Sequence, residues 1–559
     1  MMPKLIHGLH FNNLRGDVFG GVVAAVIALP LALAFGVASG AGVVAGLYGA
    51  IFVGIFAALF GGTPAQASGP TGPMTVIFAG MLTLFSDEPH LAFTTVMMAG
   101  GLLILMGALG VGRYISLVPY PVISGFMSGI GVIIIILQIG PLLGHESGGG
   151  VLVNLTALPH VVSAPMAQAA TLGFLALAIV YLTPKVIGAI MPPSLLALLV
   201  CTPIAAFFFP DAPVIGAVPQ GFPSMLVPTF RIDALTIMVE EACVLALLCA
   251  IDSLLTSLVC DNMTRTQHDS NRELIGQGIG NMVAGLFGGL PGAGATMRSV
   301  ANIRSGGRTP LSGTLMGLVL LATLLWLGPL AAHIPLAVLA GILLKVGVDI
   351  IDWRFLRHVF QAPRADVLIM VVVLFVTVAV DLITAVGVGV VLASILFVKE
   401  MADLELANMQ VITDMHEESP LTQEERAILE RNAGKIVLIH VDGPMSFGSA
   451  KNMVRRIETV PGLKQFTSCV LDLSDVPVID GTSAMAVEDM LRIIQAHQQH
   501  LFFVGMQDHV TDVLQGLGIL VLIRPGHRYA KRVDALRHAA QAAASPHPKD
   551  QLSVDETIS

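Results

Sequence analysis

The chain has 559 residues, of which 55% are hydrophobic and only 12% are charged. Soluble globular proteins carry about 25% charged residues, so the composition excludes a soluble protein and indicates an integral membrane protein. The formal net charge of −9, with no basic stripe along the sequence, argues against nucleic acid as a partner. The sequence has no glycine-rich phosphate-binding motif ending in lysine, so any transport must be passive or driven by a gradient.

Apolar segments fill most of the chain up to residue 398. Residues 18–86 contain no Asp, Glu, Lys or Arg, and a bilayer core needs about 20 apolar residues per helix, so this stretch alone holds about three crossings. The pattern predicts an α-helical polytopic membrane domain at 18–398 with about fourteen transmembrane segments. We place them near 18–38, 43–60, 71–85, 91–109, 121–142, 167–183, 187–209, 236–259, 273–290, 295–303, 311–331, 335–350, 366–381 and 382–398.

Two short sequences in this domain repeat each other. Leu-Phe-Gly-Gly occurs at 59–62 and again at 286–289, and a Pro/Gly-interrupted segment follows each copy, at 69–73 and 292–296. Broken helices at matching positions of two halves are typical of transporters and point to the binding site. We therefore expect seven-plus-seven (7+7) repeats, whose third and tenth segments are half-helices. Because seven is odd, the two repeats must have inverted orientations.

The loop charges predict the orientation in the membrane. Loops after odd-numbered segments are mainly acidic, with Arg231 as their one base. Basic residues gather in loops after even-numbered segments: Arg113, Lys185, Arg265, Arg272, Arg304, Arg308, Arg354, Arg357, Arg364 and Lys399. The positive-inside rule then places both termini, including residues 1–17, in the cytoplasm of a multi-pass protein of the plasma (inner) membrane.

The composition changes abruptly after Lys399. A polar linker is expected at 399–433, followed at 434–540 by short apolar strands that alternate with helical stretches. This alternation predicts a small soluble α/β domain. The polar residues 541–559 are expected to be a disordered tail.

One acidic residue lies inside an apolar segment. Asp252 is near the middle of the otherwise uncharged run 243–259, where an unpaired carboxylate costs about 2.5–3.5 kcal/mol. Thr256 follows four residues later, so its hydroxyl shares a helix face with that carboxylate. Hard oxygen ligands suit a small hard cation. We therefore predict a cation or proton site here, with a structural Asp bound to a neighbouring helix as the alternative.

The two half-helices supply the opposite charge. If the helices that begin near Thr71 and Thr296 point their N-termini at one cavity, their free N–H groups and positive dipole ends would bind an anion. The carbonyls of Gly294 and Ala295 could turn the other way and bind the cation beside Asp252. Arg298 could add positive potential near the anion, or could extend toward the cytoplasmic interface.

These motifs resemble the sulfate-permease (SulP) family of anion transporters over nearly the whole chain. The match rests on Ser-Gly-Pro-Thr-Gly-Pro at 68–73, Ile-Asp-Ser-Leu-Leu-Thr at 251–256, Asn-Arg-Glu-Leu-Ile-Gly-Gln-Gly at 271–278 and Thr-Met-Arg-Ser at 296–299. Residues 476–483 resemble a STAS domain. The resemblance implies a 7+7 inverted-repeat fold with core and gate domains, elevator-type motion and a homodimer formed through the STAS domain.

Arg-Gly-Asp at 15–17, Ala-Phe-Gly-Val-Ala-Ser-Gly at 34–40 and Gly-Ala-Thr at 294–296 resemble the sodium-dependent bicarbonate transporters of the family. That resemblance implies sodium as the coupling ion, with no other cofactor, held by Asp252, Thr256, Gly294, Ala295 and Thr296. It also implies bicarbonate bound by Thr71 and the backbone of Ala295 and Thr296. The alternative is a proton-coupled dicarboxylate or sulfate transporter, and the dicarboxylate transporters of the family carry Glu in place of Asp252. Gly69 departs from the Glu that we expect in the bicarbonate group.

Thr482 occupies the place of the hydroxyl that is phosphorylated in soluble STAS regulators, which makes it a regulatory candidate. We favour a structural interpretation, in which residues 480–483 cap a helix. A membrane-anchored regulatory scaffold remains an alternative of another class, against which the intramembrane acid and the two broken helices argue.

Overall fold

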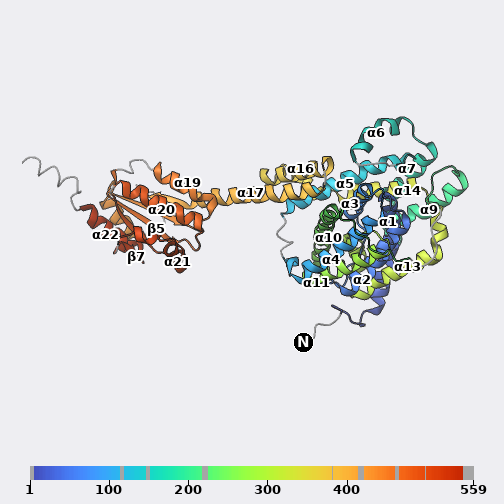
Figure 1. The fold of residues 1–559 in the computed structure, drawn as a ribbon, viewed down its shortest axis with the longest axis horizontal. Helices are drawn as coiled ribbons and strands as arrows, with labels where there is room; N and C mark the ends of the chain where they lie inside the picture. Colours follow the sequence, from blue (N-terminus) through green and yellow to red (C-terminus); the bar gives the residue numbers. More distant parts are fainter. Residues whose placement is uncertain are drawn as a thin grey trace, which may run out of the picture. The chain divides into compact units, whose positions relative to one another are not determined.

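A computed structural model describes residues 6–113, 119–146, 151–216, 224–380, 382–412, 421–459, 465–497, 499–524 and 526–544 (Figure 1). The chain divides into two compact units, Met1–Ala393 and Ser394–Ser559. The first unit is helical apart from two short strands, and the second is an α/β unit.

Helices occupy every segment that the sequence predicts to cross the membrane. In the first half they are α1 (Leu14–Ala38), α2 (Val43–Phe60), α3 (Gly72–Leu84), α4 (His90–Ala108), α5 (Tyr120–Leu142), α7 (Ala167–Leu182), α8 (Lys185–Ile190) and α9 (Pro193–Phe208). In the second half they are α10 (Leu235–Thr264), α11 (Ser270–Leu286), α12 (Thr296–Arg304), α13 (Pro310–Ala331), α14 (Leu336–Ile350), α16 (Arg364–Ala379) and α17 (Leu382–Asn408), with the short α15 (Trp353–Arg357).

The structure corrects the sequence analysis in a few places. Helix α6 (Val151–Ser163) was not expected, and it bends by 109° into α7. Helix α17 runs about ten residues beyond the expected end at 398, because polar residues continue its helical path. Within the described residues, length and composition alone qualify six helices as membrane spans, or seven if the bent α6–α7 pair is one span.

The helices of the first unit pack in two groups. In one group α11 packs against α2 and α4, α13 against α1 and α2, and α10 against α4. Small residues allow the close approach of α4 and α11, since a Cβ on Gly100 would lie 2.6 Å from the carbonyl oxygen of Gly278. In the other group α14 packs against α5 and α7, α16 against α5, and α9 against α7. Helix α3 contacts members of both groups.

Two short strands join the two halves of the first unit. Strand β1 (Ser68–Gly69) precedes α3, and strand β2 (Ala293–Gly294) precedes α12. They pair antiparallel, with Ser68 opposite Gly294 and Gly69 opposite Ala293. The broken segments of the two repeats therefore meet, as the shared motif predicts, and both half-helices begin beside this pair.

The second unit is a five-stranded sheet in the order β3-β4-β5-β6-β7, parallel except for β3. Its strands are β3 (Met409–Ile412), β4 (Ile436–Asp442), β5 (Ser468–Asp475), β6 (His500–Val504) and β7 (Arg528–Tyr529). Its helices are α18 (Gln423–Arg431), α19 (Phe447–Glu458), α20 (Gly481–Ala496), α21 (Asp508–Gly516) and α22 (Arg532–Ala544), with the one-turn η3 (Ile519–Leu522).

Helices cover both faces of this sheet. Ile439 on β4 belongs to a core shared with α19, α20 and α21, whereas its neighbour Leu438 belongs to a core shared with α18 and α22. Burial on both faces explains the near-continuous apolar strands. The residues expected as a linker, 399–433, hold the end of α17, β3 and α18, so the sheet begins before residue 434. Of the expected tail, 541–544 belong to α22, and 545–559 lie outside the described residues.

Candidate functional site

The site is built where two helix N-termini meet at the β1–β2 pair. Thr71 is the N-cap residue of α3 and Ala295 is the N-cap residue of α12. Neither N-cap side chain accepts a hydrogen bond from its helix. The first turns of both helices therefore keep backbone donors for a ligand, and their dipoles favour an anion.

Asp252 faces this junction from α10. Its side chain is buried, with 8% of the residue exposed, and its Oδ2 accepts a hydrogen bond of 3.2 Å from the hydroxyl of Thr71. The residue expected to bind the anion is therefore in direct contact with the residue expected to bind the cation.

Thr256 lies one turn further along α10 and connects Asp252 to the second broken segment. Its hydroxyl donates to the carbonyl of Gly294 at 3.0 Å and lies 2.8 Å from the hydroxyl of Thr296. A carboxylate, two hydroxyls and a carbonyl are hard oxygen donors, so this donor set fits a small hard cation such as sodium.

The backbone N–H of Ala295 does not point to the anion site, contrary to the expectation from the sequence. Its backbone N–H already donates to the carbonyl of Ala67, at 3.0 Å. This amide is therefore not available to an anion in the observed conformation, because β1 and β2 continue their pairing through it. Its carbonyl accepts the first helical hydrogen bond of α12, from Ser299 at 2.9 Å, and keeps a second lone pair.

Arg298 points into the site and not toward an interface. Only 2% of the residue is exposed, and its Nη2 donates to the carbonyl of Pro70 at 2.8 Å. A Cβ on Gly69 would lie 2.7 Å from the Arg298 Nη1, and Gly69 has a φ of +151°. Glycine at position 69, which departs from the expected Glu, leaves the space that the guanidinium fills.

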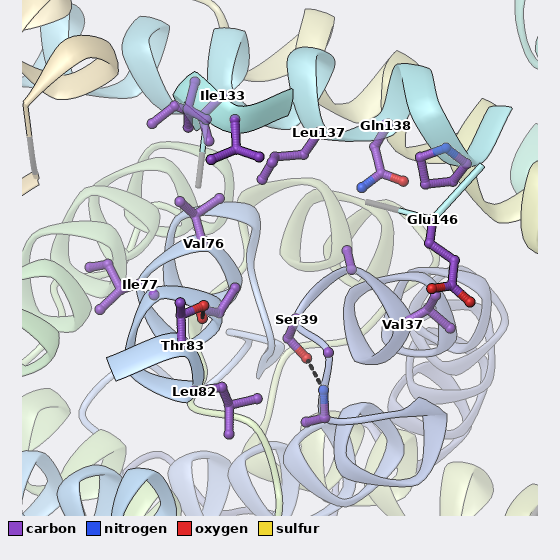
Figure 2. A pocket seen from close by; sticks show the side chains of 18 of the residues that line it. Val37, Ser39, Val76, Ile77, Leu82, Thr83, Ile133, Leu137, Gln138 and Glu146 are labelled. Carbon is purple, nitrogen blue, oxygen red and sulfur yellow. Dashed lines mark hydrogen bonds between the residues drawn. The ribbon is translucent and has the colours of Figure 1, made fainter. Parts of the chain in front are cut away.

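A cavity opens near the C-terminal ends of α1 and α3. It has a volume of about 1390 Å³, and Figure 2 shows Val76 on α3 facing Leu137 and Gln138 on α5 across it. Its lining does not include Asp252. Toward Gly72 it is followed by a space of only about 10 Å³, about the size of one water molecule. Apolar side chains of α5 and α14 close over the start of α3, since a Cβ on Gly72 would lie 2.8 Å from Ile134 and 2.6 Å from Ile350.

In the second unit, Asp480 caps α20 by accepting a hydrogen bond of 2.7 Å from the backbone N–H of Ser483. Thr482 is exposed in the first turn of that helix. Asp480 therefore caps the helix, as the structural interpretation expects, and the side chain of Thr482 takes no part in this cap.

The sequence analysis missed three buried polar residues of α11: Glu273, Gln277 and Asn281. Their four-residue spacing was the available signal, because from Glu273 onward the other residues of this helix are small or apolar. Glu273 binds the loop after α2, Gln277 binds Ser68 of β1, and Asn281 binds Gly292 just before β2.

Comparisons with known proteins agree with this architecture. The model of the sulfate permease family matches residues 14–373, and the STAS domain matches residues 428–535. The chain is 45% identical to the bicarbonate transporter BicA of a Synechocystis species, over 99% of both chains.

Two solved structures are similar to the chain. The transmembrane domain of a cyanobacterium bicarbonate transporter BicA is 52% identical, with a TM-score of 0.65 over 69% of this chain and 100% of that one. The murine Slc26a9 anion transporter in its inward-facing state is 18% identical, with a TM-score of 0.80 over 95% of this chain and 92% of that one, which shows a shared fold. The family resemblance expected from the sequence is confirmed: this chain belongs to the sulfate permease family, carries a C-terminal STAS domain, and is an anion transporter and not an enzyme.

Proposed function

We propose that the chain is a secondary transporter that carries bicarbonate together with sodium. The observation that carries this proposal is the hydrogen bond from Thr71 to Asp252, because it links the anion end of α3 to the cation carboxylate. The full-length similarity to a transporter named for bicarbonate supports the choice of anion.

Electrostatics explains why the two ions would bind together. A bare carboxylate about 4 Å from a bound anion would repel it by about 4 kcal/mol at an effective dielectric constant of 20. Sodium held by Asp252, Thr256, Thr296 and the carbonyls of Gly294 and Ala295 would cancel this repulsion. It would also free the Thr71 hydroxyl, which has a single proton, to donate to bicarbonate instead of to Asp252.

The anion half of the site would consist of Thr71, the first turns of α3 and α12, and Arg298. Thr296 contributes its backbone to this half, whereas Ala295 contributes only its carbonyl, to the cation. A buried guanidinium without a carboxylate partner is costly, and a bound anion would neutralise it. One sodium moving with one bicarbonate carries no net charge, so the membrane potential would not oppose uptake.

The transport cycle follows from the two packing groups of helices. The helix group that includes α10 and α11 carries the site and would act as the core, and α5, α7, α9, α14 and α16 would act as the gate. Together they would form fourteen spans at 18–398, arranged as 7+7 inverted repeats. Movement of the core past Ile134 and Ile350 would open the site toward the large cavity. With both termini cytoplasmic in the plasma (inner) membrane, that cavity would face outward. The STAS domain would pair two copies of the chain.

Uptake of labelled bicarbonate into proteoliposomes tests the proposal. An inward sodium gradient should drive uptake and a proton gradient should not, with fumarate and sulfate failing to compete. Proton-driven uptake that fumarate or sulfate blocks would instead assign the chain to the proton-coupled dicarboxylate or sulfate transporters.

A further inference from the structure

Three polar side chains form a row along one face of α11. Glu273, Gln277 and Asn281 follow one another at four-residue spacing, which places them on the same side of the helix. Their exposed fractions are 1%, 0% and 3%, so the row is buried. We call these three residues the polar ladder.

The first residue of the ladder holds the loop after α2. Glu273 Oε2 accepts hydrogen bonds from the backbone N–H groups of Gly62 and Thr63, at 3.0 and 2.9 Å. Its Oε1 accepts from the side-chain amides of Gln66 and Gln277, both at 2.8 Å. Four donors satisfy this carboxylate, and they fix the Gly-Gly turn that leads to β1.

The second residue reaches β1 itself. The Gln277 side-chain amide donates to the hydroxyl of Ser68 at 2.7 Å. Ser68 lies three residues before Thr71, and Gln277 belongs to the opposite repeat. The position of the anion end of α3 therefore depends on a side chain of α11.

The third residue reaches the segment that leads to β2. Asn281 makes two hydrogen bonds with Gly292: its Nδ2 donates to the carbonyl at 2.9 Å and its Oδ1 accepts from the N–H at 2.8 Å. A Cβ on Gly292 would lie 2.5 Å from the carbonyl carbon of Gly69, so the two segments touch here. Gly294, whose carbonyl accepts from Thr256, lies two residues further on.

We propose that the polar ladder positions the two halves of the site separately, Gln277 acting on the anion half through Ser68 and Asn281 on the sodium half through Gly292. This inference rests on the proposed function, because it assigns the halves to bicarbonate and sodium. Gln277 and Asn281 are positioning residues, since they contact the segments that carry the proposed ligand groups and are not themselves among those groups. Their effect comes from orientation: a small displacement of a binding group weakens binding out of proportion to its size.

The test measures two constants in proteoliposomes, the half-saturating sodium concentration at saturating bicarbonate and the KM for bicarbonate at saturating sodium. Asn281→Leu removes two hydrogen bonds to Gly292 and should raise the sodium constant about tenfold while the bicarbonate KM stays within about twofold. Gln277→Met should raise the bicarbonate KM about tenfold while the half-saturating sodium concentration stays within about twofold. Met282→Leu, at a position 38% exposed on the same helix, is the matched control and should change neither constant.

Smaller substitutions keep the test decisive if a ladder variant does not fold. Ser68→Ala should raise the bicarbonate KM about threefold, and adding it to Gln277→Met should raise the KM little beyond that of Gln277→Met alone, because both changes remove the same hydrogen bond between Gln277 and Ser68. Cys249→Ala, which removes a second donor to the Gly292 carbonyl at 3.3 Å, should raise only the sodium constant.

Equal changes of both constants in every variant, or a loss of maximal rate alone, would overturn the ladder proposal. Proton-driven uptake by the unmodified protein would instead overturn the proposed function. In that case the ladder still predicts that Asn281→Leu shifts the half-saturating proton concentration and Gln277→Met shifts the anion KM.

Discussion

The two units of this chain differ in how they accommodate most of their buried charges. In the first unit, Asp17, Asp252, Glu273 and Arg298 are all at most 8% exposed, and within the described residues none of them forms an ion pair. Their partners are hydroxyls, amides and backbone groups, such as the Thr309 hydroxyl that donates to Asp17 at 2.8 Å.

In the second unit a group of buried charges forms ion pairs, whereas Glu405 there accepts hydrogen bonds from Ser446 and Ser449. Asp472 on β5 lies 3.0 Å from His440 Nδ1 and 3.2 Å from Arg532 Nη1, and Arg532 Nε lies 3.3 Å from Glu425. Removing one partner of a buried ion pair destabilises a fold, whereas a charge inside the membrane without a counter-charge is a candidate ion site. The difference is consistent with the proposed ion binding by the first unit and with a structural role for the ion pairs of the second.

The largest expected effect is at Asp252. Asp252→Ala removes the carboxylate of the cation site and should abolish sodium-dependent bicarbonate uptake in proteoliposomes. Asp252→Glu keeps the charge and should retain part of the coupled uptake. Glu240→Ala, at an exposed position of the same helix α10, is the matched control and should leave uptake unchanged. Sodium-dependent uptake that survives in Asp252→Ala would contradict the assignment of this carboxylate.

The next largest effect is expected at Arg298. Arg298→Met removes the buried positive charge near the anion and should raise the KM for bicarbonate about tenfold, as expected for the loss of a hydrogen-bonded charge. The measurement is the initial uptake rate against bicarbonate concentration at saturating sodium. Arg304→Met, in the exposed last turn of the same helix, should leave this KM unchanged. An unchanged KM in Arg298→Met would place the anion elsewhere.

In the second unit, substitution should change stability and not transport. Asp472→Ala leaves His440 and Arg532 without their shared partner and should lower the free energy of unfolding by about 3 kcal/mol. Denaturant unfolding of residues 394–559, which contain their own two cores, measures it. A change below about 0.5 kcal/mol would show that the cluster contributes little.

The carboxylate of Asp472 also predicts that the stability of the second unit depends on pH. Burial raises the pKa of Asp472, but hydrogen bonds from His440 and Ser474 and the nearby Arg532 outweigh burial, so the pKa lies below its ordinary value of 3.8. A carboxyl group whose pKa is lower in the folded state stabilises the fold above its unfolded pKa. This stabilisation is complete at neutral pH and is lost as the pH falls below about 4. Asp472→Asn should remove this part of the acid dependence.

The smallest effect is expected at Thr482. Thr482→Ala changes an exposed side chain and should alter the free energy of unfolding by less than about 0.5 kcal/mol and leave uptake unchanged. Asp480→Ala, two residues earlier, removes the N-cap of α20 and should cost about 1 kcal/mol. Loss of uptake in Thr482→Ala would instead support a regulatory role for this hydroxyl.

Much of the architecture could be predicted from the sequence, because long apolar runs and a repeated Gly-Gly motif are local signals. The meeting of the two broken segments follows from that repeat. Helix α6 could not be predicted, since Pro159 and several polar residues weaken its apolar pattern.

Only part of the arrangement of the candidate site residues could be predicted from the sequence. Asp252 and Thr256 share a helix face, which their spacing reveals. The pairing of the Ala295 amide with Ala67 could not be predicted, because it depends on the register of two strands far apart in the sequence. The burial of Arg298 could not be predicted either, because it depends on the space that the distant Gly69 leaves for the guanidinium.

The most direct test of the account is the ratio of labelled sodium to labelled bicarbonate taken up by the unmodified protein in proteoliposomes, measured with and without an imposed membrane potential. We predict one sodium for each bicarbonate and an uptake rate that the potential does not change, because the pair carries no net charge. Bicarbonate uptake without sodium, or a rate that follows the potential, would contradict the coupling at Asp252.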